Sequence, residues 1–424
     1  MILNKPLLYS KTLILTLDFT NNLKNNHLKI LPFMKISNLI KSISMVLLLM
    51  GISTVAGAME ISDSVLPTSV TDEQQYNKVI HIMAMLLLGF GFLMVFVRKY
   101  GRSALTATFI LVSTAIPLYF IIHNSGIIGE GSPEIKSMIL AEFAAASLLI
   151  TAGAVLGRLK MPQYILLGLL FVPFYMINEW ISFDEGLGLI SKGALLDTGG
   201  SITIHAFGAI FGLGVALTMT TKQEFEKTIE TDATSDRYSM LGSMFLWVFW
   251  PSFCAALVTP EQMPHTVVNV IIALCGSTLA TYIFSASIRK KINIADIANA
   301  SLAGGVAIGS ACAVASHTQA AIIGIIAGAI STLGFAVIQS RQQKLMKVID
   351  TCGVSNLHGI PGLIGGFAAA PFLLPGNLSG HLSGIGITIV LALVFGFITG
   401  KILPLLGRKI EAYEDAEEFM DVQE

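Results

Sequence analysis

Eleven long apolar stretches follow one another along this chain, separated by short polar segments. A helix needs about 20 predominantly apolar residues to cross the hydrocarbon core of a bilayer. Each stretch is long enough to form such a helix. The stretches occupy residues 79–97, 103–122, 138–157, 163–183, 199–219, 238–258, 266–288, 296–315, 319–339, 354–373 and 382–406. The sequence therefore predicts an all-α integral membrane protein with about 11 transmembrane helices.

The composition excludes several classes of protein. Charged residues make up only 12% of the chain and hydrophobic residues 54%, whereas about a quarter of a soluble globular chain is charged. The 26 basic and 27 acidic residues nearly balance, so a nucleic-acid partner is not expected. The four cysteines lie in or beside apolar runs without a CxxC pair, and no HExxH motif occurs. We therefore expect no metal, no cofactor and no enzymatic activity.

The first part of the chain resembles an export signal. Residues 34–58 contain two early lysines, an apolar run at 43–55 and an A-x-A site at 56–58. This is the pattern of a secretory signal peptide, and its apolar run is shorter than a membrane span requires. Residues 1–33 then precede the true start, and the mature chain begins near Met59. The alternative is an uncleaved additional helix.

The positive charges predict the orientation of the chain. With the mature N-terminus outside, the connecting segments place 17 lysines and arginines inside and only Lys78, Lys136 and Lys192 outside. Cytoplasmic loops carry such an excess of basic residues. We therefore expect a multi-pass protein of a bacterial inner (plasma) membrane, with a membrane domain at 59–406 and an acidic cytoplasmic tail at 407–424. The tail is interpreted mainly as a solvated face.

Two pairs of similar segments indicate an internal repeat. Residues 197–205 and 350–358 each begin with Asp-Thr and end with histidine, at an offset of 153. Residues 141–148 and 295–302 form a second similar pair, at an offset of 154. The repeat moves the third span onto the eighth and the fifth onto the tenth, so the second copy is upside down. This predicts an inverted five-helix repeat with a substrate path at the repeat interface.

The repeat places two histidines deep in the membrane. Eight residues separate each aspartate from its histidine, and at 1.5 Å per residue this spacing carries His205 and His358 roughly 12 Å along their helices. Ionisable residues near the bilayer midplane are costly and indicate a functional site; the alternative is a pair of neutral histidines that only join helices. Five other histidines of the expected mature chain are interpreted as lying outside the site: His81, His123, His265, His317 and His381.

Five ordered strings resemble the Rh (Rhesus-like) branch of the ammonium transporter (Amt/Mep/Rh) family. They are GFGFLMVFVRKYG (89–101), DTGGSITIHAFGAIFGL (197–213), SMLGSMFLWVFWPSF (239–253), IANASLAGGVAIG (297–309) and DTCGVSNLHGIPGLIGG (350–366). The resemblance implies a homotrimer with one narrow pore in each subunit. It also implies roles for six residues, with His205 and His358 as the pore histidines, Phe143 and Phe253 as the gate, and Asp197 and Asp350 as supports of the outer and inner vestibules.

The implied function is passage of ammonia. A low-dielectric pore with neutral imidazoles suits neutral ammonia far better than the ammonium cation, which would lose its proton at the mouth. The open alternatives are a CO2 channel and an electrogenic ammonium or proton-coupled transporter, and methylamine is a possible second substrate. Trp180 is left outside the site. Three buried polar residues could line the path or join helices: Glu142, Asp296 and Asn299.

Overall fold

The computed structural model describes residues 68–129 and 131–420, and all regular structure within these residues is helical. The expected signal peptide at 34–58 and the preceding residues lie outside the described part of the chain. Nine of the described helical segments are long and apolar enough to cross a membrane. They are Glu73–Phe96, Gly101–Ser125, Glu134–Ala154, Met161–Phe183, Ser201–Met219, Met263–Arg289, Ile294–Ala311, His317–Met346 and Leu378–Leu406. The prediction of a multi-span all-α membrane protein is confirmed.

Two further segments coincide with predicted spans but do not belong to these nine. Helix α9 (Ala233–Cys254) overlaps the predicted span at 238–258, and η7 (Ser355–Gly359) with α15 (Ile360–Ala369) overlaps the one at 354–373. Both segments begin with polar residues, which lowers their hydropathy. The predicted count of eleven therefore stays a prediction.

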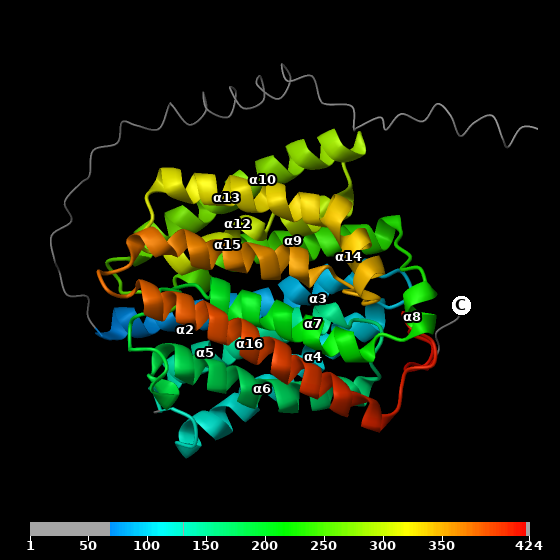
Figure 1. The fold of residues 1–424 in the computed structure, drawn as a ribbon, viewed down its shortest axis with the longest axis horizontal. Helices are drawn as coiled ribbons and strands as arrows, with labels where there is room; N and C mark the ends of the chain where they lie inside the picture. The colour runs from blue at the N-terminus through cyan, green and yellow to red at the C-terminus, as the bar shows by residue number, and fades with distance from the viewer. Residues whose placement is uncertain (1–67, 130, 421–424) are drawn as a thin grey trace, which may run out of the picture. The chain divides into compact units, whose positions relative to one another are not determined.

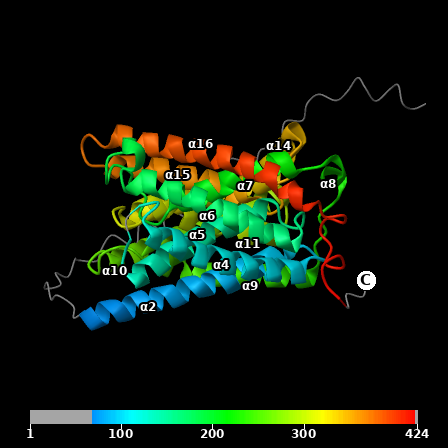
Figure 2. The same cartoon turned by 90° about the horizontal axis from the view of Figure 1, so that it is seen from below.

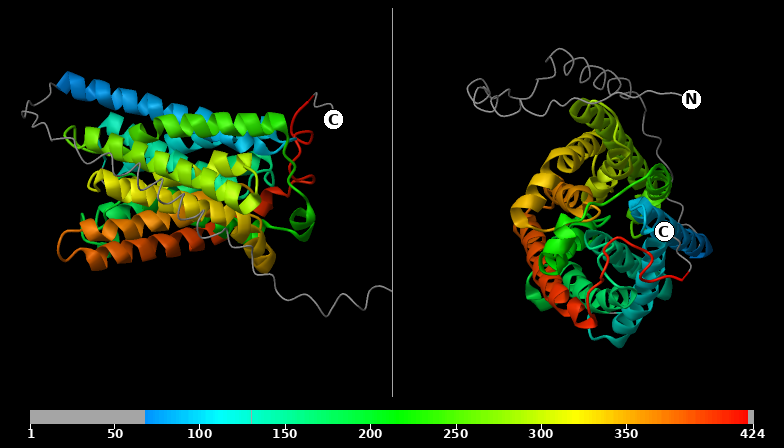
Figure 3. Two further views of the ribbon diagram at one scale, coloured as in Figure 1. Left: turned by 90° about the horizontal axis from the view of Figure 1, so that it is seen from above. Right: turned by 90° about the vertical axis from the view of Figure 1, so that its right-hand side faces the viewer.

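Most spans are continuous, and several change helix type along their length. Their elements are α2 (Thr68–Ala84), η1 (Met85–Phe90), α3 (Gly91–Leu93), η2 (Met94–Phe96), α4 (Gly101–Ser125), α5 (Glu134–Ala154), α6 (Met161–Phe183), η4 (Ser201–Ala206), α7 (Phe207–Met219), α10 (Met263–Arg289), α11 (Ile294–Ala300), α12 (Ala303–Ile308), η5 (Gly309–Ala311), α13 (His317–Leu333), η6 (Gly334–Ile338), α14 (Gln339–Met346) and α16 (Leu378–Ile402). The short helix α8 (Lys222–Glu226) lies in the connection between α7 and α9. The long helices run roughly along one direction (Figure 1), and α2 and α16 lie at opposite edges (Figure 2). Figure 3 shows the same helices from above and end-on.

The two copies of the repeated segment have the same local structure. Gly200 (φ 74°) and Gly353 (φ 67°), which are 153 residues apart, both adopt the left-handed conformation. A side chain at such a position would be strained, so the turn favours glycine. Each glycine lies just before a stretch of π-helix, η4 in the first copy and η7 in the second. Such stretches often occur at functional sites.

The copies also run in opposite directions. The backbone N–H of Ile349, just before the second copy, donates a hydrogen bond to Thr220 Oγ1 at the end of α7 (3.3 Å). The second copy therefore starts where the first copy ends. The aspartates of the two copies consequently lie at opposite ends of the helix assembly, with the histidines between them.

Small residues allow three helices to pack closely beside the repeat. A Cβ atom added to Gly304 in α12 or Gly324 in α13 would lie 2.1 Å from the carbonyl oxygen of Ala273 in α10. Small residues commonly permit such backbone approach in membrane helices. Alanine at either glycine would force these helices apart.

The acidic tail packs against the helices. Asp415 accepts hydrogen bonds from the backbone N–H groups of Arg102 (3.0 Å) and Ser103 (2.9 Å) in the first turn of α4. Glu418 accepts a bond from the N–H of Met161 in the first turn of α6 (3.2 Å). Carboxylates at helix N-termini satisfy free N–H groups and complement the helix dipole. Asp415 is buried, so the expectation of a solvated face is wrong for this part of the tail.

Candidate pore

A cavity of about 360 Å³ opens at the end of the protein that carries Asp197, and it is called the outer cavity after the orientation that the sequence predicts. Its walls include Tyr119, Glu179, Trp180 and Phe143. The hydroxyl of Tyr119 donates a 2.6 Å hydrogen bond to Glu179 Oε2. A carboxylate and an indole ring are both groups that attract small cations. The cavity therefore has the chemistry of a cation vestibule.

Sequence reasoning missed part of this vestibule. Glu179 is an ionisable residue inside an apolar stretch, and that alone marks a functional hypothesis. Trp180 was set aside, yet its side chain lines the same cavity. The sequence shows Glu179 as a carboxylate within an apolar stretch, which could have identified it. Trp180 can be assigned to the cavity only from the structure, in which α6 packs beside the other elements that line it.

Phe143, in the wall of this cavity, packs against a second phenylalanine. The rings of Phe143 in α5 and Phe253 in α9 lie with centroids 4.7 Å apart and planes at 51°. Both side chains are buried, and Phe143 also lines the outer cavity. The structure therefore brings the two sequence-predicted gate residues into contact, directly beneath the vestibule.

The two histidines meet beyond the phenylalanine pair. His205 Nδ1 lies 3.2 Å from His358 Nδ1, with the ring planes inclined by only 11°. The exposed fractions of the residues are 0% and 3%, respectively. The ring centroid of His205 is 6.0 Å from that of Phe253 and 5.4 Å from that of Trp250. Nε2 of His205 is buried without a hydrogen-bond partner among the described residues.

This contact determines what the pair can offer to a ligand. Only one of the two Nδ1 atoms can carry the proton of their shared hydrogen bond. In a pair of neutral rings, the ring that donates through Nδ1 has a bare Nε2, and the other ring carries its proton on Nε2. The pair therefore presents one donor and one acceptor. Ammonia can bind both.

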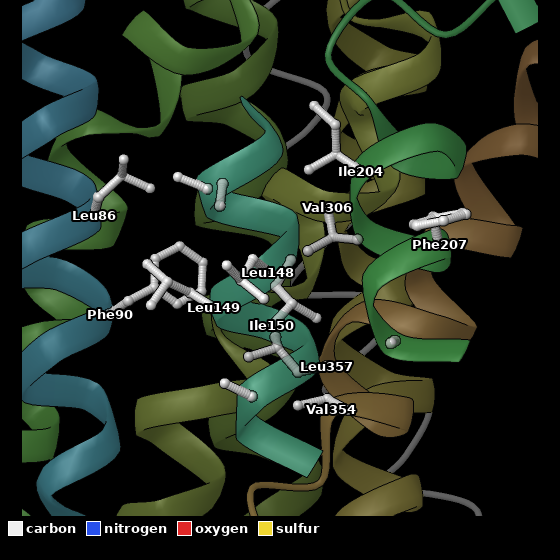
Figure 4. Packing of buried hydrophobic residues seen from close by; sticks show 14 of the residues in the cluster. Leu86, Phe90, Leu148, Leu149, Ile150, Ile204, Phe207, Val306, Val354 and Leu357 are labelled. Atoms are coloured by element: carbon white, nitrogen blue, oxygen red, sulfur yellow. The ribbon is translucent and has the colours of Figure 1, made fainter. Parts of the chain in front are cut away.

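Two further cavities, here called the inner cavities, lie beside and beyond His358. The first has a volume of about 30 Å³ and is bounded mainly by apolar side chains, together with His358 and Asn299. Three of these apolar side chains, Phe90, Leu149 and Leu357, come from different segments and converge (Figure 4). A second cavity of about 240 Å³ shares Phe96, Asn299 and Cys352 with the first. The histidine pair thus lies between two wider spaces.

Asp197 holds the start of the segment that carries His205. Its carboxylate accepts bonds from the N–H groups of Ile202 (3.1 Å) and Thr203 (2.8 Å) and from Thr203 Oγ1 (2.8 Å). Ser310 Oγ, from the second half of the chain, donates a further bond (2.5 Å). The bonds from the two N–H groups cap the helix, because these groups would otherwise be unsatisfied.

Asp350 makes the equivalent contacts at the opposite end. Its carboxylate accepts bonds from the N–H groups of Val354 and Ser355 (both 2.9 Å) and from Ser355 Oγ (2.7 Å). Burial raises the pKa of Asp350, while these hydrogen bonds and the charge of Arg158 oppose that rise. Each aspartate therefore anchors the segment of its own histidine.

The remaining polar residues separate into different roles. Asp296 is held by Arg289 (2.7 Å) and by Ser285 (2.7 Å), which join α10 to α11. Asn299 lines both inner cavities. Glu142, next to Phe143, is buried, and neither carboxylate oxygen has a partner within residues 68–129 and 131–420. Asp296 therefore joins helices, whereas Asn299 lies in the wall of two cavities.

The five other histidines that the structure describes lie apart from the histidine pair. His81 contacts Ser252 Oγ through Nδ1 (2.9 Å), and His123 lines the outer cavity. His265 and His317 both contact Asn269. His381 is buried against α15.

The comparisons agree on one family. The Ammonium Transporter Family matches residues 42–424. Ammonium transporter Rh type B of Oryctolagus cuniculus is 37% identical over 333 residues, which cover 76% of this chain and 70% of that protein. Ammonium transporter Rh type A of Canis lupus familiaris is 36% identical over 310 residues, covering 70% of this chain and 71% of the relative.

Solved structures give the same result. Nitrosomonas europaea Rh50, of the Rhesus protein family of channels, matches with a TM-score of 0.82 and 52% identity, covering 84% of this chain and 94% of that one. A structure described as a sensor Amt protein has a TM-score of 0.72 at 18% identity, over 84% of this chain and 98% of the other. That second likeness concerns the fold alone. This chain therefore belongs to the ammonium transporter family, and within it to the Rh branch.

Proposed function

We propose that this protein conducts ammonia across the membrane through the path between its outer and inner cavities. Ammonium would be collected in the vestibule of Glu179 and Trp180, lose its proton there, and pass the phenylalanine and histidine pairs as neutral ammonia. The observation that carries the proposal concerns Nε2 of His205, whose ring lies next to that of Phe253. This atom is buried and has no hydrogen-bond partner among the described residues. Buried polar atoms are nearly always hydrogen-bonded, so an unpaired one is a natural place for a small polar ligand.

The energetics favour the neutral species. Moving a small ion from water into a medium of low dielectric constant has an idealised cost on the order of 20 kcal/mol. The unpaired polar groups of ammonia cost only about 2–7 kcal/mol. The donor and acceptor of the histidine pair offset part of that smaller cost. Passage without the proton therefore needs much less stabilisation from the pore.

The resemblance of the sequence strings to the Rh branch implies a homotrimer with one pore in each subunit, embedded in the lipid bilayer. We propose this assembly together with the orientation expected from the basic residues, with the C-terminus in the cytoplasm. In this orientation the cavity of Glu179 faces outward.

The proposal is tested by reconstituting the protein into vesicles that contain a pH-sensitive dye. An outward ammonium gradient should change the internal pH faster than in protein-free vesicles, because ammonia leaves the vesicle and its proton stays behind. A parallel CO2 jump on the same vesicles tests the rival cargo. Equal rates with and without protein for ammonia, together with accelerated CO2 entry, would overturn the proposal.

The gate is expected to act by steric exclusion. Phe143→Ala or Phe253→Ala should raise the ratio of methylamine to ammonia flux by roughly tenfold, which corresponds to about 1.4 kcal/mol of barrier. Removal of the ring opens a cavity and deletes no charge. The control is Phe174→Ala, which removes a ring stacked on Phe395 (centroids 4.0 Å apart) away from the described cavities. Loss of all conduction in both gate variants, with the fold intact, would contradict the steric role.

A further inference from the structure

Two buried side chains hold equivalent positions in the two copies of the repeat. The N–H of Leu196 donates to His381 Nδ1 (3.2 Å), and Arg158 Nη2 donates to the carbonyl oxygen of Ile349 (2.8 Å). Leu196 and Ile349 are 153 residues apart, and each directly precedes the aspartate of its copy. The two contacts therefore occur at the same point of the repeat, although His381 and Arg158 do not correspond by the repeat offset.

His381 joins three segments at the Asp197 end. Its side chain extends from α16, Nε2 donates to the carbonyl oxygen of Gly366 in α15 (2.8 Å), and Nδ1 accepts from Leu196. The exposed fraction of the residue is 0%. A carbonyl can only accept and a backbone N–H can only donate, so these partners require the proton on Nε2 and none on Nδ1. The imidazole therefore accepts one hydrogen bond through Nδ1 and donates one through Nε2, each to a fixed backbone group.

Arg158 joins three segments at the Asp350 end. Nη2 also donates to the carbonyl oxygen of Ala154 at the end of α5 (2.7 Å), and Nη1 donates to Thr220 Oγ1 after α7 (2.9 Å). The side chain is fully buried, and the carboxylate of Glu224 lies 4.0 Å away. A guanidinium can hold several acceptors in one plane. Arg158 thus fixes the segment before Asp350 against both helices.

We propose that His381 and Arg158 are positioning residues, each of which holds the segment of one pore histidine in place. By holding Leu196, His381 fixes where Asp197 begins the segment of His205. By holding Ile349, Arg158 fixes where Asp350 begins the segment of His358. The two segments meet in the Nδ1 contact of 3.2 Å, which a small shift of either would break. The consequence for conduction rests on the proposed function; the positioning itself does not.

Two conservative variants separate the contacts of His381. Asparagine can keep an acceptor near the place of Nδ1, whereas glutamine can keep a donor near the place of Nε2. The proposal predicts that His381→Asn retains more conduction than His381→Gln, because the bond to Leu196 is the one that positions Asp197. A role limited to joining α15 and α16 predicts the reverse order. Thr388→Val is the control, since it removes a buried bond from the same helix to Asn178 (3.0 Å).

Arg158→Met tests the other half. It removes every hydrogen bond of the guanidinium and keeps a side chain of similar length, while Arg158→Lys keeps the charge and a single donor group. Partial rescue by lysine is expected, because one ammonium group can still reach the Ile349 carbonyl. Gln163→Leu is the matched control at the same end, where Gln163 bonds to the carbonyl oxygens of Leu403 (2.8 Å) and Gly407 (2.9 Å).

Hydrogen–deuterium exchange of the whole protein in vesicles measures positioning independently of conduction. Loss of one hydrogen bond of about 1.4 kcal/mol should speed exchange about tenfold. We expect this in residues 197–206 for His381→Gln and in residues 350–359 for Arg158→Met, each without change in the other segment. The inference would be overturned if a variant exchanged equally fast in both segments, or if the control variants showed the same increase in exchange rate as the His381 and Arg158 variants. If the parent protein conducts no ammonia but the two variants still show faster exchange, each in its own segment, then the positioning role is upheld and the proposed function is refuted.

Discussion

Asp197→Ala is expected to lower the free energy of unfolding by about 3–5 kcal/mol, more than any other substitution in the pore. The change leaves four donors without an acceptor, namely the N–H groups of Ile202 and Thr203 and the hydroxyls of Thr203 and Ser310. Each unsatisfied buried donor costs about 1–3 kcal/mol, although relaxation recovers part of the sum. The measurement is thermal unfolding of the purified protein in detergent.

Related variants should lower the free energy of unfolding by smaller amounts. Asp197→Asn keeps one acceptor oxygen and should cost less than alanine. Asp350→Ala leaves three donors rather than four, so its effect should also be smaller. Glu185→Ala is the control, because this carboxylate accepts a bond from the N–H of Lys192 at an exposed site (2.8 Å). An unchanged melting temperature for Asp197→Ala would show that the cap is dispensable.

His205→Ala and His358→Ala should each reduce ammonia permeability by about tenfold to a hundredfold. Each change removes one member of the donor and acceptor pair and leaves the other buried without a partner, at a cost of about 1–3 kcal/mol. The double variant should lose less than the sum of the two, because members of one hydrogen-bonded unit are not additive. Stopped-flow ammonia permeability of vesicles, normalised to the protein content, measures all three.

A histidine outside the pair provides the control. His81 lies in a membrane span and contacts Ser252, yet it lines none of the described cavities on the path. His81→Ala should leave the permeability unchanged. Full permeability in the double His205 and His358 variant, with its helix content intact, would show that apolar walls suffice and that the pair only packs.

The repeat carried most of what the sequence could predict about the pore. The aspartate, glycine and histidine of each copy are spaced identically, and a left-handed glycine followed by a helix is a local property. Phe143 and Phe253 could be named only through the family resemblance, because their contact joins α5 to α9. The inverted order of the copies followed from counting spans, and the contact of Ile349 with Thr220 agrees with it.

Other features depended on packing between distant segments. His381 is one histidine near a span end in the sequence, and its contact with Leu196 exists only because α16 lies beside the Asp197 segment. The acidic composition of the tail predicts a solvated face, yet Asp415 caps α4, more than 300 residues earlier in the chain. Polarity at the start of α9 likewise shows why counting apolar stretches and applying a hydropathy threshold give different numbers of spans.

In the proposed mechanism, the cargo crosses the histidine pair without its proton. The most direct test records ammonia flux and electrical current simultaneously on the same reconstituted membranes of the parent protein. We predict a protein-dependent flux with no accompanying current, and the appearance of a current when His205 or His358 is replaced by aspartate, if that acid ionises. A current in the parent that rises in proportion to the ammonium flux would contradict neutral passage and identify ammonium, or ammonia with a proton, as the moving species.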